Sequence, residues 1–225
     1  MLGTLVNAGA IIAGGILGML LQKGLPENLR KTLMAGMGLC VVLIGLKGAF
    51  GTGSEMLVIL SVVIGSIIGV LLKLEQRLER VGNRLQVLFA TRKSETFAKG
   101  FVTATLMYCV GAMAIVGSMD SGLRGDHSTL LAKSILDGVS SVILTSMMGP
   151  GVLLSAASVL VYQGAITLLA QVAAPILTER VITEMSAVGG LLVVGIGLNM
   201  IRKDHIPVGD MLPAMFMPLL LTLVM

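Results

Sequence analysis

The stretch Thr129-Leu-Leu-Ala-Lys133-Ser-Ile-Leu-Asp137-Gly-Val-Ser-Ser-Val-Ile-Leu-Thr-Ser-Met-Met148 decides which class of fold this chain adopts. It has the length of a membrane-crossing helix, which needs about 20 predominantly apolar residues. It also carries a lysine and an aspartate, and ionisable groups at membrane depth are costly and usually face a cavity or a partner. The stretch therefore predicts a transmembrane helix whose polar side chains face the interior of a protein.

The composition of the whole chain agrees with a membrane protein. Of its 225 residues, 55% are hydrophobic and 12% are charged, whereas soluble domains carry about 25% charged residues. So few charges cannot cover the surface of a soluble fold of this length. The composition therefore excludes a soluble enzyme and predicts an all-α bundle that has lipid as its solvent.

Eight segments are apolar and long enough, or nearly so, to cross a bilayer. They cover residues 2–22, 31–50, 54–72, 100–119, 129–148, 151–173, 185–201 and 210–225. The last two are short, so a tilted or re-entrant segment is an alternative, and a bundle of seven spans is the main alternative to eight. Residues 1–225 form a single transmembrane domain in this interpretation, because no separate soluble domain fits in what remains.

The distribution of basic residues predicts the orientation. With the N-terminus outside, the connections 23–30, 73–99, 149–151 and 202–209 are cytoplasmic, and with the adjoining Lys31 they hold twelve of the sixteen lysines and arginines. The opposite loops hold Arg124 and Arg180 alone. Cytoplasmic loops carry the excess of positive charge, so we expect both termini outside for eight spans, and the C-terminus inside for seven. The net charge of +4 then indicates anionic lipid, and not nucleic acid, as the partner.

Residues 71–88 differ from the spans, because leucine and valine recur there at three- and four-residue spacing between charged residues. This pattern is typical of an amphipathic helix. We expect this helix to continue from the third span and to be followed by a polar linker, so that helix and linker together cover residues 71–96. Its stripe lies on the inner leaflet, with Arg77, Arg80 and Arg84 at the lipid headgroups, or packs against a second copy of the chain in a homo-oligomer. A solvated connector is the third alternative.

The chain contains an internal similarity. Gly38-Leu-Cys-Val-Val-Leu-Ile-Gly-Leu46 and Gly190-Leu-Leu-Val-Val-Gly-Ile-Gly-Leu198 agree at seven of nine positions. Two shorter matches fall in the same order, with Gly9-Ala-Ile11 resembling Gly164-Ala-Ile166 and Glu55-Met-Leu57 resembling Asp210-Met-Leu212. Corresponding spans are five apart, an odd number, so spans 1–3 and 6–8 would form an inverted repeat of the kind found in secondary transporters.

Lys133 and Asp137 are the strongest candidates for a functional site. They are four residues apart and so share one face of the fifth span, with Asp137 about 13 Å along it. Such a pair can carry a proton or offer a carboxylate to a cation, and the alternative is a structural ion pair. The weaker candidates are polar residues of the first, fifth, sixth and seventh spans, namely Asn7, Ser140, Ser141, Gln163 and Asn199.

Nothing in the sequence predicts a catalytic residue, a cofactor or a metal site. Cys40 and Cys109 lie in apolar runs without a CxxC partner, and the common hydrolase and nucleotide-binding motifs are missing. A serine–lysine dyad formed by Lys133 with Ser140 or Ser141 would lack a recognisable oxyanion hole. We therefore expect a protein that is not an enzyme.

Four stretches of the chain together resemble one bacterial family. They are Val6-Asn7-Ala8, the stretch from Gly125 to Asp137, Ser186-Ala-Val-Gly-Gly-Leu191 and Met211-Leu-Pro-Ala214. The chain resembles the YqgA/YdfK-type inner-membrane proteins, also called domain of unknown function 554, over essentially its whole length. The resemblance implies a multi-spanning protein of the cytoplasmic membrane but supplies neither a substrate nor a reaction.

Two functional hypotheses follow. The first is a small secondary transporter or channel for a small solute or ion, with Lys133 and Asp137 as its charged centre. The second is a membrane scaffold or assembly partner that does not transport and acts through the basic amphipathic helix.

Overall fold

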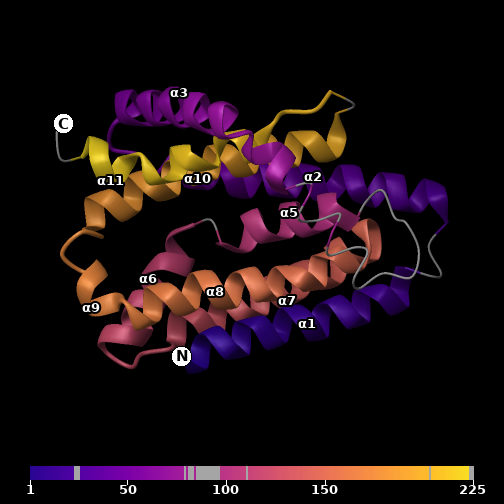
Figure 1. Ribbon diagram of the computed structural model, residues 1–225. Coiled ribbons are helices and arrows are strands. Elements are labelled where there is room, and N and C mark those ends of the chain that lie inside the picture. The colour runs from indigo at the N-terminus through magenta and orange to yellow at the C-terminus, as the bar shows by residue number, and fades with distance from the viewer. Residues whose placement is uncertain are drawn as a thin grey trace. The chain divides into compact units, whose positions relative to one another are not determined.

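The computed structural model describes residues 1–22, 26–78, 80, 84, 97–109, 111–202 and 204–222. Within these residues every regular element is helical and no strand occurs, as Figure 1 shows. The chain divides into two compact units that each combine distant parts of the sequence. Unit 1 comprises Met1–Arg30, Leu78–Cys109 and Met113–Ala173, and unit 2 comprises Lys31–Arg77, Val110–Ala112 and Ala174–Met225.

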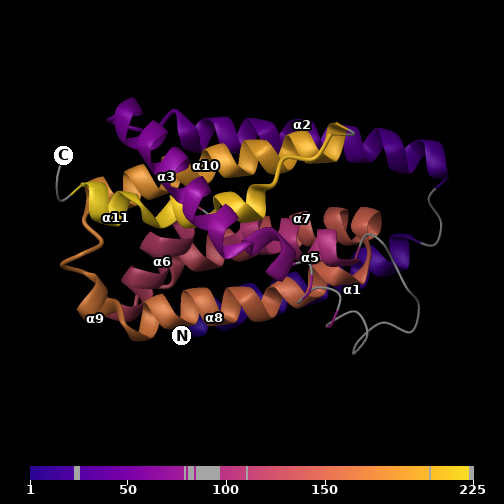
Figure 2. The ribbon, with the colours of Figure 1, turned by 45° about the horizontal axis from the view of Figure 1, so that its top comes forward.

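Unit 1 is built around three long helical segments. They are α1 (Leu2–Gln22), α7 (Ser128–Met148) and α8 (Ser155–Leu168), the last preceded by the 3₁₀ helix η1 (Pro150–Leu154). These segments run alongside one another in both Figure 1 and Figure 2. The shorter helices of unit 1 are α5 (Phe97–Cys109), α6 (Ala112–Leu123) and α9 (Ala170–Ala173).

Glycines bring α1 close to α7. A Cβ atom added to Gly14 would overlap the carbonyl oxygen of Gly138, and one added to Gly18 would overlap that of Val142. Gly14 and Gly18 therefore serve helix packing, since small residues let two backbones approach closely. Residue numbers rise together along the contact, so α1 and α7 are parallel.

The direction of α8 relative to α1 is the opposite. Asn7 on α1 bonds Gln163 on α8, whereas Gly15, farther along α1, packs against Leu153 at the start of the η1–α8 segment. Residue numbers therefore run in opposite senses along this contact, and the two segments are antiparallel.

Unit 2 contains two pairs of segments that also pack through glycines. The first pair is α2 (Glu27–Ala49) with α10 (Glu179–Ile201). A Cβ on Gly45 would lie 2.6 Å from the carbonyl oxygen of Gly190, and one on Gly38 would lie 2.9 Å from that of Gly197. Early residues of α2 thus meet late residues of α10, and the two helices are antiparallel.

The second pair of unit 2 is α3 (Glu55–Leu72) with the C-terminal segment, which consists of η2 (Val208–Phe216) and α11 (Pro218–Leu221). Figure 2 shows α3 beside this yellow segment. Gly65 packs against the backbone of Ala214, and Gly69 packs against the backbone of Asp210. This pair is therefore antiparallel as well.

Six helical segments among the described residues are long and apolar enough to cross a membrane, and the number is seven if the bent pair α5–α6 counts as one span. Large apolar side chains on α7, such as Ile135, Leu136 and Val139, are exposed, as expected for a surface that meets lipid. The all-helical architecture with apolar helices that the composition predicts is thus present, and the count of about eight spans is not confirmed by the described residues.

Three predicted spans differ in detail. Residues 100–119 are not one straight helix, because α5 and α6 meet at an angle of 58°. The seventh span is longer than predicted, because Thr178 caps α10 by accepting the backbone N–H of Val181. The predicted eighth span is largely a 3₁₀ helix that contains Pro213, which lacks the N–H that an α-helix needs.

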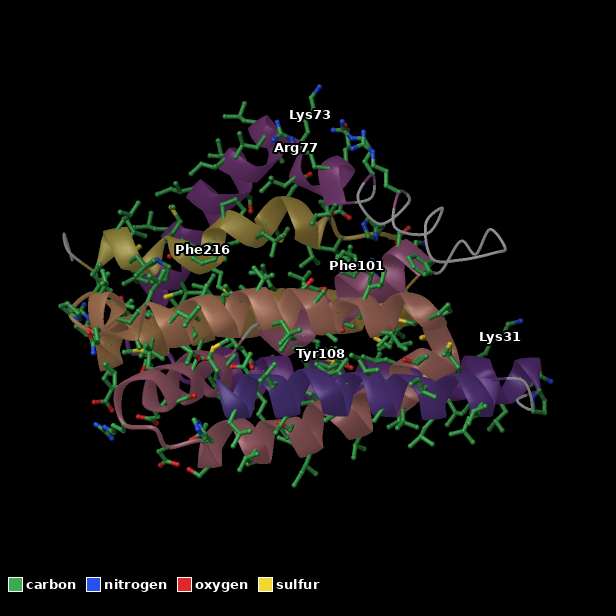
Figure 3. The ribbon with its side chains drawn as sticks, turned by 60° about the horizontal axis from the view of Figure 1, so that its bottom comes forward. Lys31, Lys73, Arg77, Phe101, Tyr108 and Phe216 are labelled. Carbon is green, nitrogen blue, oxygen red and sulfur yellow. The ribbon has the colours of Figure 1, made fainter. Side chains whose placement is uncertain are left out.

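The amphipathic helix does not continue directly from the third span. Lys73 ends α3 in a left-handed conformation with φ of 52°, so the helical residues 74–78 begin after a break in the chain direction. Lys73 and Arg77 are exposed, and Figure 3 shows the Lys73 side chain extending away from the ribbons. Much of the predicted helix and linker, residues 79, 81–83 and 85–96, lies outside the described residues.

Candidate functional site

A buried polar stripe runs along α7. Its members recur every four residues, which places them on one helix face: Lys133, Asp137, Ser141 and Thr145. Each is at most 6% exposed. At 1.5 Å per residue the stripe is about 18 Å long. It thus covers more than half of a hydrocarbon core that is about 30 Å thick.

Lys133 and Asp137 form an ion pair within this stripe. The Lys133 Nζ atom lies 2.9 Å from Oδ1 and 2.8 Å from Oδ2 of Asp137. The sequence places the two residues on one face, and the structure shows that they bind each other and that this face points into unit 1. In a buried pair of this kind each group has the other as its partner, and neither is exposed to lipid.

Two amide side chains from other helices complete the cluster. Asn7 of α1 donates from Nδ2 to Oδ2 of Asp137 at 3.0 Å and to Oε1 of Gln163 of α8 at 3.4 Å. Both amides are fully buried. Four of the predicted residues, from three separate spans, therefore form one hydrogen-bonded group, which we call the amide–ion cluster (Asn7, Lys133, Asp137 and Gln163).

Many buried polar atoms of unit 1 have no hydrogen-bond partner among the described residues. Such atoms are uncommon in protein interiors, because leaving a buried donor or acceptor unpaired costs about 1–3 kcal/mol. In unit 1 they are Thr4 Oγ1, Asn7 Oδ1, the Tyr108 hydroxyl, Ser118 Oγ, Thr145 Oγ1, Gln163 Nε2 and Thr167 Oγ1. Figure 3 labels Tyr108, which the sequence interpretation did not select.

The structure separates the two predicted serines of α7. The Ser141 hydroxyl donates to the carbonyl oxygen of Ile11 on α1 at 2.8 Å and is fully buried. Ser140 is half-buried and lies about 100° farther around the helix, outside the stripe. Of the pair, Ser141 alone therefore belongs to the buried polar face.

The remaining predicted residues lie outside the cluster. Asn199 belongs to unit 2, where its amide donates to the carbonyl of Ile206 and accepts the N–H of the same residue, both at 2.8 Å. It therefore holds the loop after α10. Arg77, Arg80 and Arg84 are exposed, and their contact with lipid headgroups stays a prediction.

Unit 2 contains a buried carboxylate that the sequence interpretation missed. Glu184 is 2% exposed and accepts the Thr52 hydroxyl at 2.5 Å and the Gly53 N–H at 2.8 Å. It lies beside an open pocket of about 460 Å³ that also includes Ser54, Arg180 and Thr183. The predicted seventh span begins at residue 185, one residue after Glu184. An acidic residue inside a span would have indicated a candidate site, but this boundary placed Glu184 outside the span.

A second unpredicted cluster in unit 2 connects the residues that follow α3 to the residues at the start of η2. Glu75 accepts the Gly209 N–H at 2.7 Å and lies 2.7 Å from Nε2 of His205, while Asp210 accepts the Glu75 N–H at 2.9 Å. These contacts hold the start of η2 against the end of α3. No sequence pattern links residues so far apart.

Long apolar helices around a buried ion pair define a helical membrane protein. The chain also matches the family described as "Protein of unknown function (DUF554)" over residues 2–223, and it belongs to that family. The resemblance in the sequence is therefore confirmed.

Two relatives cover nearly the whole chain. The protein "Uncharacterized membrane protein YdfK" of Bacillus subtilis (strain 168) is 31% identical over 222 residues, which are 97% of this chain and 94% of that protein. The protein "Uncharacterized protein YqgA" of Escherichia coli (strain K12) is 31% identical over 220 residues, or 96% of this chain and 94% of that protein. No solved structure matches the chain significantly.

Proposed function

We propose that this membrane protein is a small secondary transporter or channel for a small solute or ion, and not an enzyme, and that the amide–ion cluster is its binding site. The observation that carries the proposal is the buried pair of Lys133 and Asp137, which is bonded to Asn7 of another helix. Intramembrane ionisable groups that face a protein interior commonly mark pathways for solutes, ions or protons.

The polar stripe on α7 supports a pathway more than a structural contact. A purely structural ion pair needs one partner for each charge, whereas here buried hydroxyls continue along the same face to Thr145. Thr145 on this face, and Thr4 on α1, have hydroxyls without a partner among the described residues. A passing solute would supply the hydrogen bonds that these groups lack.

The helix directions support the inverted repeat. The three pairs of segments that the internal similarity relates are α1 with α8, α2 with α10, and α3 with the C-terminal segment, and each pair is antiparallel within its own unit. In the α2–α10 pair, Gly38 meets Gly197 and Gly45 meets Gly190. Because the repeat equates Gly38 with Gly190 and Gly45 with Gly197, the two contacts are reciprocal, as a two-fold relationship requires.

The same directions support a count of eight crossings. α1 and α7 are parallel, so an odd number of crossings lies between the end of α1 and the start of α7. The bent pair α5–α6 then counts as one crossing after α2 and α3. The C-terminal segment runs back along α3, and its 3₁₀ part, at about 2.0 Å per residue, lets residues 208–221 reach about 25 Å. The basic loops support an orientation with both termini outside, and the family resemblance implies an inner-membrane location.

Flux measurements in proteoliposomes test the proposal. The full-length protein should increase the permeation of at least one member of a panel of ions, protons and small metabolites above that of protein-free liposomes. Asp137→Asn should abolish this flux, because it removes the charge that positions both Lys133 and Asn7.

The matched control is Asp120→Asn. Asp120 also pairs with a basic residue four positions away, Arg124. In this pair the Arg124 side chain is 77% exposed and the Asp120 side chain is half-buried, so flux should be retained. The elution profile of each variant on gel filtration shows whether it is folded. If no panel member crosses faster in the presence of the wild-type protein, the proposal is wrong whatever the variants do.

A further inference from the structure

We propose that the amide–ion cluster selects small uncharged solutes that carry a hydrogen-bond donor next to an acceptor, such as carboxamides and polyols. This inference rests on the proposed function and names its substrate class. It follows from the charge balance of the cluster and from the two amide atoms that the cluster leaves unused.

The first step concerns charge. Among the residues that the structure describes in unit 1, Lys133 and Asp137 are the buried charged side chains. They neutralise each other at 2.8 Å, so the interior has no net charge with which to balance a bare ion. An ion moved from water into such an interior loses its hydration energy, which a neutral polar solute does not have to replace.

The second step concerns the carboxylate, which is already in use. Lys133 contacts both of its oxygens, and Asn7 donates to Oδ2. A cation that approached Asp137 would come within a few ångströms of the Lys133 ammonium, and like charges at that separation repel strongly away from bulk water. The carboxylate therefore positions its neighbours and is not free to coordinate a cation.

The third step concerns the orientation of the amides. Asn7 must turn Nδ2, its donor, toward the carboxylate, and the same Nδ2 reaches Oε1 of Gln163. This leaves one acceptor, Asn7 Oδ1, and one donor, Gln163 Nε2, both fully buried and without a partner in the described structure. A ligand that donates to the first atom and accepts from the second satisfies both.

The fourth step concerns the groups along the route. Three threonine hydroxyls without a partner lie on the same helices as the cluster residues. Thr4 lies one turn before Asn7, Thr167 one turn after Gln163, and Thr145 two turns after Asp137. A hydroxyl both donates and accepts. Such groups can replace the water around a neutral polar solute but offer no compensating charge to an ion.

The test begins with the wild-type protein in liposomes. Stopped-flow light scattering measures the entry of urea and acetamide, which represent carboxamides, and of glycerol, which represents polyols. Voltage- and pH-sensitive dyes measure the entry of K⁺, Na⁺, Cl⁻ and H⁺ into the same liposomes. We expect at least one neutral solute to enter about tenfold faster than into empty liposomes, while ion entry stays at the level of empty liposomes.

Two glutamine variants then test the amide contact. Gln163→Leu removes the unused donor and should reduce neutral-solute entry about tenfold. Gln171→Leu makes the same change at an exposed position of α9 and should leave entry unchanged. Asn7→Leu is a second variant of the cluster and should resemble Gln163→Leu, and the wild-type measurement decides the matter if either variant fails to fold.

Three results overturn the inference. Entry of an ion without entry of any neutral solute would leave the transporter proposal intact but reverse the substrate class. Entry of ions and neutral solutes at comparable rates would remove the selectivity. Entry of nothing above the empty-liposome rate would overturn both this inference and the proposed function. The carboxamide and polyol arms show which of the two chemistries the site prefers.

Discussion

Asn7 of α1 donates its side-chain N–H to the carboxylate of Asp137 on α7 at 3.0 Å, although the two residues are 130 positions apart. This bond connects α1 to the buried ion pair of α7. It also fixes the orientation of the Asn7 amide. A carboxylate can only accept hydrogen bonds, so the amide must turn its NH₂ group, and not its oxygen, toward Asp137. The direction of this bond therefore determines which amide atoms of Asn7 and Gln163 are used within the cluster and which are left without a partner.

Removing one member of the ion pair should destabilise the protein more than removing both. Lys133→Met leaves the Asp137 charge without its partner, and breaking a buried pair in this way costs about 3–5 kcal/mol. The double variant Lys133→Met with Asp137→Leu removes both charges and should recover most of the loss. Thermal unfolding in detergent, followed by far-UV circular dichroism, measures both effects.

Breaking the exposed pair serves as the reference for this comparison. Arg124→Ala disrupts the contact with Asp120, in which the arginine side chain is 77% exposed, and should change stability by less than about 1 kcal/mol. An equal loss for Lys133→Met and Arg124→Ala would show that the Lys133–Asp137 pair is not buried as described.

Substitution by alanine should destabilise the protein at Gly45 of α2 but not at Gly36 of the same helix. Gly45→Ala places a Cβ atom 2.6 Å from backbone atoms of Gly190 and Val194, and overpacking of this kind costs about 1–3 kcal/mol. Gly36→Ala adds its Cβ to open space and should be neutral or stabilising by up to about 1 kcal/mol, since alanine favours a helix. Unfolding midpoints of the two variants, measured side by side, test the α2–α10 contact.

Ser141→Ala should weaken the protein, and Ser140→Ala should not. The Ser141 hydroxyl bonds the carbonyl of Ile11 on another helix, and interhelical hydrogen bonds of this kind in membranes contribute about 0.6 kcal/mol on average. The neighbouring Ser140 lies off the buried stripe. Equal unfolding free energies for the two variants would contradict the assignment of the stripe to the face of Ser141.

Glu184→Ala should release the loop between α2 and α3. It removes the acceptor of the Gly53 N–H and of the Thr52 hydroxyl, and a buried donor left unpaired costs about 1–3 kcal/mol. Hydrogen exchange of residues 51–54 should become faster, with a smaller change for Glu184→Gln because a glutamine oxygen still accepts one bond. Glu179→Ala, at an exposed position nearby, is the control and should leave the exchange unchanged.

Cysteine labelling tests the proposed orientation. In a variant without Cys40 and Cys109, a cysteine introduced by Arg124→Cys should react with a membrane-impermeant maleimide from the outside of the cell. One introduced by Asp204→Cys should react only in inside-out vesicles. The basic loops place these positions on opposite sides, so labelling of both from the same side would contradict an odd number of crossings between them.

The α7 region shows how far the sequence alone could predict the site. Spacing in the sequence was sufficient to place Lys133 and Asp137 on one face, because an α-helix repeats every 3.6 residues. Membrane depth was sufficient to select Asn7 and Gln163 as candidates. Neither argument could show that these amides meet the ion pair, since helices that are distant in sequence choose their neighbours through side-chain packing.

The errors have physical causes as well. Glu184 was missed because a boundary drawn from hydropathy stops at a charged residue, although the Gly53 N–H and the Thr52 hydroxyl make its burial tolerable. The continuous helix through Lys73 was wrong because a left-handed residue other than glycine leaves no pattern in hydrophobic spacing. Asn199 bonds Ile206 through both its Nδ2 and Oδ1 atoms, and its role in a pathway stays a prediction.

The sequence by itself determined that this chain is a helical membrane protein, because its few charges cannot cover a soluble surface, and it selected the four polar residues of the amide–ion cluster. The tertiary structure alone decided which of them bind one another. Burial in lipid is a property of local composition, whereas a hydrogen bond between Asn7 and Asp137 depends on close glycine contacts between α1 and α7 that bring two separate helices into register.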